Sequence, residues 1–130
     1  MRIGLFVHGL PPRATHGVET HTQAFAEALA RAGFAVEVFA PCNSPGRAQY
    51  SQRREVRAEG YGVTWVQVEG TMDPRHMARA VGAFLDRERP DVVHLQHMIQ
   101  LGAAAIEEVE RRGVPLVYTA HDFFPVHETL

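Results

Sequence analysis

The sequence predicts an α/β fold: a Rossmann-like open parallel sheet with helices on both faces. Short apolar runs typical of buried strands alternate along the chain with stretches whose apolar residues recur at helical spacing. Two helical stretches also end alike, because Arg31-Ala32-Gly33-Phe34 and Arg111-Arg112-Gly113-Val114 each end a helix at glycine and begin a strand. A length of 130 residues corresponds to one domain with a sizeable core.

The first half of the chain predicts a strand, a helix, a second strand and a hairpin. Residues 3–7 and 35–39 are short apolar runs, and Pro41 is expected to stop the second one. Apolar residues at helical spacing predict a helix over about 18–32. Alternating residues on either side of Gly60-Tyr61-Gly62 predict a β-hairpin insertion over about 54–69, although a helix over 51–59 competes with its first strand.

The second half alternates helices and strands. Asp73-Pro74 is a helix start, with Asp as N-cap and Pro in the first turn, and Pro90 ends that helix. Its apolar face comprises Met77, Ala80 or Val81, Phe84 and Leu85. A strand over 91–95, a helix ending at Gly113 and a buried strand over 114–120 follow.

Composition excludes several classes of function. Every one of the 13 Lys and Arg residues is Arg, so a Walker A phosphate loop and Schiff-base catalysis are excluded. A net charge of −2 gives no reason to expect nucleic acid as a partner. The single Cys42 cannot form an intrachain disulfide, Met1 leads directly into a strand, and no apolar run approaches the ~20 residues of a membrane span. We therefore expect a cytoplasmic protein.

Polar residues follow three of the predicted strands directly. His121-Asp122 comes after the last strand, and Val7-His8-Gly9 and His94-Leu95-Gln96-His97 end two others. In open α/β sheets, ligands bind beyond the carboxyl ends of the strands. These residues are therefore expected to contribute to one site.

Several motifs occur in an order seen in one family. They are Gly17-Val18-Glu19-Thr20-His21, the amphipathic helix, Arg31-Ala32-Gly33, the strand ending at Pro41, Arg89-Pro90-Asp91-Val92-Val93-His94 and Thr119-Ala120-His121-Asp122. From residue 1 to about residue 126, the chain resembles the N-terminal domain of retaining glycosyltransferases of family 4, which have the GT-B fold. The resemblance implies that residues 1–130 are a single acceptor-side domain, truncated and inactive alone, without the C-terminal donor-binding domain. The family's E-x7-E glutamate pair has no counterpart, and the spacing of Glu19 and Glu27 is treated as chance.

The resemblance also implies the function and the roles of individual residues. The intact protein would be a hexosyltransferase-type enzyme that moves a sugar from a nucleotide-sugar donor to an acceptor with retention of configuration. His121 would contact the transferred sugar and stabilise the transition state, beside Asp122, which is expected to orient a loop or cap backbone N–H groups rather than act as a nucleophile.

The first helix supplies the other residues of the implied site. Gly17 and His16 would lie near the donor diphosphate, although Gly17 could instead be a turn glycine, and His16 replaces the first of the family's two consecutive glycines. Acceptor contacts would come from Glu19, Thr20, His21 and His97. Thr20 and Gln23 also fit a capping box, and Glu19 could simply complement the positive end of the helix.

No metal or other cofactor is expected beside the nucleotide-sugar, because His94 and His97 at i, i+3 on a strand point to opposite faces. The expected partners are the donor, an unidentified acceptor and the C-terminal domain. Peripheral membrane contact stays open, and an uncovered sheet edge with the apolar tail 123–126 could let the fragment self-associate. The alternative function is a stand-alone Rossmann-like module that binds a nucleotide or small molecule, although Gly-x-Gly-x-x-Gly is absent; a hydrolase or epimerase has no supporting motif.

Overall fold

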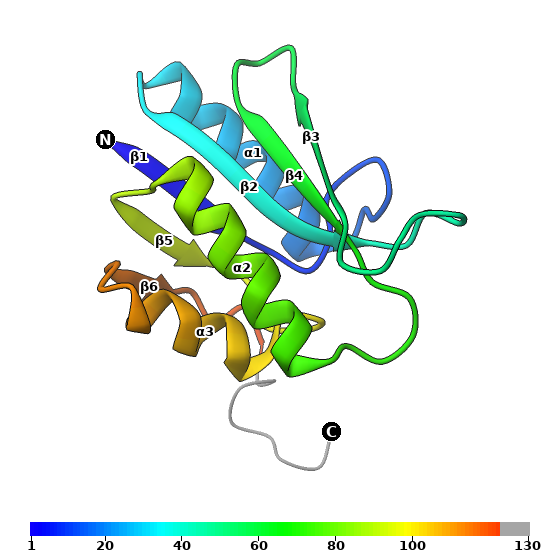
Figure 1. Ribbon diagram of the computed structural model, residues 1–130. Coiled ribbons are helices and arrows are strands. Elements are labelled where there is room, and N and C mark those ends of the chain that lie inside the picture. Colours follow the sequence, from blue (N-terminus) through cyan, green and yellow to red (C-terminus); the bar gives the residue numbers. More distant parts are fainter. Residues whose placement is uncertain (123–130) are drawn as a thin grey trace.

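A computed structural model describes residues 1–122 as one six-stranded sheet between two layers of helix (Figure 1). In chain order the elements are β1 Arg2–Phe6, α1 Gly17–Arg31, β2 Ala35–Cys42, β3 Gln52–Val56, β4 Gly62–Gln67, α2 Pro74–Glu88, β5 Val92–Leu95, α3 Gly102–Arg111 and β6 Leu116–Tyr118. The predicted α/β class, the three helices and the hairpin insertion are confirmed.

The order of the strands creates a switch point in the sheet. The order is β3-β4-β2-β1-β5-β6, and all neighbours pair in parallel except β3 with β4. On one side of β1 the next strands are therefore β2 and β4. Later in the chain, β5 and β6 are added on the other side of β1. The carboxyl ends of β1 and β5 flank this reversal, where open α/β sheets form their ligand crevice.

Two hydrophobic cores cover the two faces of the sheet because alternate strand residues point to opposite sides. The rings of Phe6 and Phe39 lie 5.1 Å apart, centroid to centroid, at a tilt of 33°, and both pack against Phe84 of α2. Their neighbours Leu5 and Val38 belong to the second core, beneath α1. Figure 1 shows α1 on one side of the sheet with α2 and α3 on the other, so the expectation of helices on both faces is confirmed.

The second strand runs through Pro41 to Cys42, so the prediction that Pro41 stops it is wrong. The carbonyl of Phe39 bonds Val7 on the β1 side, whereas the carbonyl of Cys42 bonds Val68 on the β4 side. Residues alternate between the two neighbours, so Pro41 faces the β1 side at a level where β1 has already ended. The missing N–H of Pro41 therefore costs the sheet no hydrogen bond.

The hairpin prediction is confirmed, and the competing helix over 51–59 is wrong. Strand β3 pairs antiparallel with β4 from Gln52 opposite Val66 to Val56 opposite Gly62. Gly60 turns the chain between them in the left-handed region, at φ 92°. Cross-strand pairing with a fully buried β4 decides the conformation of β3, a segment whose own residues are mostly polar.

The last strand is shorter and less buried than the sequence predicts. Strand β6 spans three residues rather than 114–120, and the side chain of Val117 is 49% exposed. The reason is its place at the edge of the sheet formed by residues 1–122, where β5 is its one partner strand. The apolar tail 123–126 lies outside the described residues. Within residues 1–122, no helix combines the length and the apolar character needed to cross a bilayer.

Candidate functional site

Two histidines meet at the switch point. His8 follows β1 and His97 follows β5, and their ring centroids lie 4.5 Å apart at an interplanar angle of 59°. Both positions are fixed by the backbone, because Gln96 N–H donates to the carbonyl of Phe6 at 2.7 Å just beyond the last paired residues. The sequence prediction that polar residues after β1 and β5 converge is met by this contact.

His8 pairs with a carboxylate of α1. Its Nε2 lies 2.8 Å from Oε1 of Glu19, whose residue is only 3% exposed. Burial lowers the pKa of His8, and the neighbouring carboxylate of Glu19 opposes that shift. A neutral His8 therefore donates a hydrogen bond from its Nε2–H to Oε1 of Glu19. The structure thus places Glu19, an expected acceptor residue, inside the site as the partner of His8 rather than on the exposed tip of the helix.

His97 is held from both sides of its ring. Its Nδ1 accepts a hydrogen bond from the backbone N–H of Ile99 at 3.1 Å, so the neutral ring carries its proton on Nε2. That Nε2 donates to Oδ2 of Asp122 at 3.0 Å. The contact brings together His97, predicted to bind acceptor, and Asp122, predicted to accompany His121. Asp122 therefore links the loop after β6 to the loop after β5.

His121 points toward the same edge. Its Nε2 lies 2.7 Å from Oε1 of Gln96, and its ring meets that of His21 edge-on at 5.1 Å. Burial lowers the pKa of His121, the nearby rings of His21 and His97 lower it further, and Asp122 opposes them. A neutral imidazole with two distinct nitrogens is therefore available beside α1 at neutral pH.

Three side-chain bonds connect β5 and its loop to β6 and its loop at a constant separation of 25 residues. They join His94 Nε2 with Thr119 Oγ1 at 2.7 Å, Gln96 with His121, and His97 with Asp122. His94 lies under α1, where its ring meets Phe25 edge-on at 5.5 Å. These bonds continue the parallel pairing of β5 with β6 beyond the three residue pairs of the backbone register.

The N-terminus of α1 is open. His16 is its N-cap residue but makes no capping bond with its side chain, and Gly17 is the first helical residue. The φ angle of Gly17 is not in the left-handed region, and a Cβ there would meet no described atom within 4 Å. The alternative that Gly17 is needed for its dihedral angle is therefore wrong.

The capping-box prediction for Thr20 and Gln23 is also wrong. The helix begins a turn before Thr20, whose hydroxyl donates to the carbonyl of Thr15 at 3.3 Å. Thr20 and His21 both lie on the first turns of α1 with exposed side chains. The ring of His21 contacts the ring of His121.

A cleft of about 420 Å³ opens at the ends of β1 and β2, lined by His8, Gly9, Arg13, Ala14, Pro41, Cys42 and Asn43. A smaller hollow of about 180 Å³ continues from it and shares His8, Pro41, Cys42 and Asn43. Arg13 stacks on the ring of Trp65, with its guanidinium carbon 5.2 Å from the ring centroid. Arg13 could not be identified from the sequence, because a single arginine in a loop has no periodic signal and its contact with Trp65 depends on tertiary structure.

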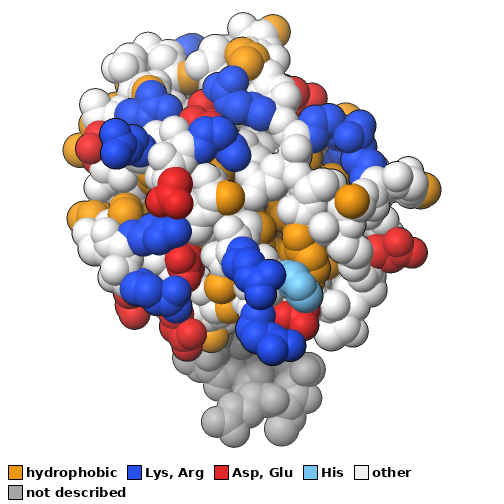
Figure 2. All heavy atoms as spheres, in the orientation of Figure 1, with side chains coloured by type: hydrophobic (Ala, Val, Ile, Leu, Met, Phe, Trp, Pro, Cys, Tyr) orange, Lys and Arg blue, Asp and Glu red, His pale blue; other side chains and the backbone are white. Residues whose placement is uncertain are grey.

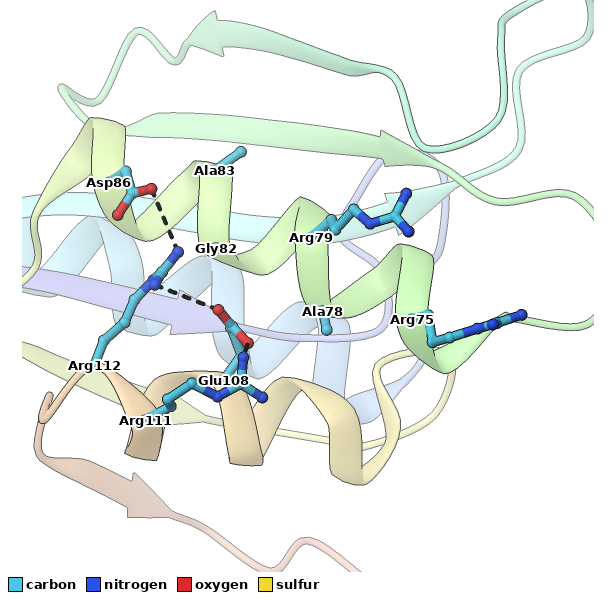
Figure 3. A pocket seen from close by; sticks show the side chains of 9 residues that line it. All are labelled: Arg75, Ala78, Arg79, Gly82, Ala83, Asp86, Glu108, Arg111 and Arg112. Atoms are coloured by element: carbon cyan, nitrogen blue, oxygen red, sulfur yellow. Dashed lines mark hydrogen bonds and ion pairs between the residues drawn. The ribbon is translucent and has the colours of Figure 1, made fainter.

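A larger hollow of about 550 Å³ lies between α2 and α3, away from the carboxyl edge (Figure 3). Its charges are largely satisfied by one another: Glu108 binds Arg111 at 2.6 Å and Arg112 at 3.4 Å, and Arg112 also binds Asp86 at 3.3 Å. Figure 2 shows arginines lying among carboxylates over this side of the molecule. The hollow is therefore a solvated, salt-bridged helix face. Among residues 1–122, no three His, Cys, Asp or Glu side chains are grouped to hold a metal ion.

The architecture defines a class of protein, an open α/β domain with its polar site at the switch point of the sheet. Sucrose-phosphate synthase from Thermosynechococcus elongatus has a similar structure, with a TM-score of 0.54 and 15% identity over 95% of this chain and 66% of that one. A universal stress protein family member from Burkholderia pseudomallei gives a TM-score of only 0.47 at 12% identity, covering 91% of this chain and 94% of that one, and adds nothing to the comparison. No curated protein matches the chain in sequence.

Residues 15–130 match the family model for Glycosyltransferase Family 4. The chain belongs to Glycosyltransferase Family 4, as the order of its sequence motifs predicts. It spans about two thirds of the length of the synthase structure, whose likeness at this identity is one of fold.

Proposed function

We propose that the intact protein transfers a hexosyl group from a nucleotide-sugar to an acceptor with retention of configuration, and that residues 1–130 form its acceptor-side domain. The proposal is carried by a neutral His121 at the carboxyl edge of the sheet, beside the open N-terminus of α1, in a Family 4 domain. A donor-binding domain outside residues 1–130 would complete the cleft.

The donor diphosphate would bind at the N-terminus of α1, where backbone N–H groups and the helix dipole favour an anion. The absence of any described atom within 4 Å of a Cβ on Gly17 supports this assignment, because a phosphate can approach the backbone there. Arg13, in the neighbouring cleft, would add a guanidinium group whose planar set of donors suits phosphate oxygens.

Retention would proceed without a protein nucleophile from this domain. Retaining hydrolases use two carboxylates about 5 Å apart. Within residues 1–122, Glu19 and Asp122 of this site are already partners of histidines, Glu19 of His8 and Asp122 of His97. The acceptor oxygen would bond to the anomeric carbon as the bond to the diphosphate breaks, and the departing phosphate would take the acceptor's proton. His121 would hydrogen-bond the sugar while positive charge develops on the sugar ring.

Replacing His121 tests this function directly. We expect His121→Ala to lower kcat of the intact protein by about 10²–10³-fold, since a preorganised polar contact to the transition state is lost. The measurement is release of nucleoside diphosphate and formation of glycosylated product with a panel of nucleotide-sugars.

The matched control is His76→Ala, which removes an exposed histidine of α2 whose ring contacts are with Tyr50 and Asp73. It should leave kcat near that of the unmodified protein. Normal turnover in His121→Ala would refute the assigned role. Absence of sugar transfer by the unmodified protein from every donor would favour the alternative of a binding module.

A further inference from the structure

Gln96 is the most deeply buried polar residue at the site. It follows β5 directly, its exposed fraction is 0%, and its backbone is tied to Phe6. Its Oε1 lies 2.7 Å from Nε2 of His121, whereas its amide Nε2 has no hydrogen-bond partner in the described part of the chain. An unsatisfied buried amide is costly, so the fold alone gives no reason for a glutamine here.

The contact with Gln96 sets the proton position on His121. An amide oxygen only accepts hydrogen bonds, so the facing Nε2 of His121 must carry the proton. In the neutral ring the other nitrogen, Nδ1, then keeps its lone pair and can only accept. No hydrogen bond joins Nδ1 of His121 to another residue within 1–122.

We propose that Gln96 is a positioning residue that holds His121 as the neutral Nε2–H tautomer, so that Nδ1 accepts a hydrogen bond from a hydroxyl group of the sugar substrate. The inference rests on the proposed function and deepens it, because it states the direction of the hydrogen bond. The ligand group must be a donor, such as a sugar O–H, rather than a carboxylate or a phosphate oxygen.

Two neighbouring histidines have hydrogen-bond partners of a different kind from Gln96. The hydroxyl of Thr119 can donate or accept, so it does not fix the tautomer of His94. The carboxylate of Asp122 fixes Nε2–H on His97, but it would also stabilise a charged ring. Gln96 is neutral and accepts only through oxygen, so it selects one tautomer of the neutral ring and adds no negative charge that would stabilise the imidazolium.

The ring nitrogens of His121 report the tautomer directly. In ¹⁵N-labelled protein at pH 8, long-range ¹H–¹⁵N spectra should show a protonated Nε2 and an unprotonated Nδ1. Gln96→Leu, close in size and apolar, should give a mixture of both tautomers for His121. Gln67→Leu is the matched control: Gln67 is also buried, at 2% exposure, but it bonds Ser44 and Asn43 and should leave His121 unchanged.

Turnover of the intact protein tests the consequence. Gln96→Leu should lower kcat at least tenfold while the KM for the donor changes less than threefold, because the contact is strongest in the transition state. Gln96→Glu places a carboxylate against Nε2 and should raise the pKa of His121, so the acid limb of the kcat profile should move to higher pH.

Three results would overturn the assignment: an Nδ1–H tautomer in the unmodified protein, an unchanged tautomer in Gln96→Leu, or normal kcat in that variant. If the unmodified protein transfers no sugar at all, the proposed function fails by itself. The spectra then still decide whether Gln96 sets the tautomer, so the two failures are distinguishable.

Discussion

The described fold does not require a glycine at position 17. The backbone angles of Gly17 suit any amino acid, and a Cβ there points into open space. Glycine at this position is therefore explained by something that approaches the helix end, and the donor diphosphate is the ligand that the proposed function supplies.

Gly17→Val should weaken donor binding by about tenfold or more, because the branched side chain would occupy the space that the phosphates need. The measurement is titration calorimetry of the intact protein with the nucleoside diphosphate. The melting temperature should stay within about 2 °C of the original, since nothing in the fold is displaced. Unchanged affinity would mean that Gly17 is not at the donor site.

At the residue scale, the sequence predicts where the site lies better than how its side chains pair. His8, His97 and His121 were found because each follows a strand, and parallel strands end at one edge of the sheet. The partners of Glu19 and His121 depend on the position of α1 and on the register of β5 with β6. Neither quantity can be derived from the local pattern of residues.

At the scale of elements, the ion pair that connects the hairpin to β2 depends on the small size of one glycine. Gly62 begins β4, opposite Glu37 of β2, and the ion pair between Glu37 and Arg54 of β3 lies across it. A Cβ on Gly62 would lie 2.6 Å from Nη2 of Arg54 and would overlap the carboxylate of Glu37. The glycine therefore makes room for the ion pair that joins β3 to β2 across β4.

Gly62→Ala should lower the free energy of unfolding by about 1–3 kcal/mol, the usual cost of overpacking a filled site. Chemical denaturation with urea measures it. The control is Gly17→Ala at the start of α1, where a Cβ would meet no described atom within 4 Å. No atom is displaced there, so the free energy of unfolding should stay within about 0.5 kcal/mol of the original. Equal losses in both variants would contradict this account.

The helices and strands were predicted well where a residue has a strong local preference. Asp73 caps α2 by accepting from the N–H groups of Arg75 and His76, as the Asp-Pro pair predicts, and Gly33 and Gly113 take positive φ after α1 and α3. Prediction failed at Pro41, where the effect of a residue depends on what lies beside it in the sheet.

The whole molecule should lose stability in mild acid. Burial lowers the pKa of His8, His94 and His121 below the usual 6.5. Below about pH 6.5 the unfolded chain therefore binds more protons than the folded chain, and the free energy of unfolding falls with falling pH. Melting temperatures followed by circular dichroism should be constant from pH 8 to 7 and should fall by a few degrees, roughly 3 °C or more, between pH 6.5 and 5.

His94→Gln removes one of the three titrating rings and should make this decline shallower. The comparison is His16→Gln, which replaces an exposed histidine whose side chain makes no capping bond. The slope of melting temperature against pH should remain unchanged in that variant. If both variants melt with the same pH dependence as the original protein, these half-buried histidines are not the source of the acid sensitivity.

The three bonds between residues 25 apart have a consequence for motion. Strand β6 is a three-residue edge strand, so it belongs to the part of a domain that opens most readily. When it detaches from β5, the bonds of Thr119, His121 and Asp122 to their partners break together while the centre of the sheet remains folded. The backbone N–H of Thr119 donates to the carbonyl of Leu95. Its amide hydrogen exchange would therefore measure the fraction of molecules in which the arrangement around His121 is intact.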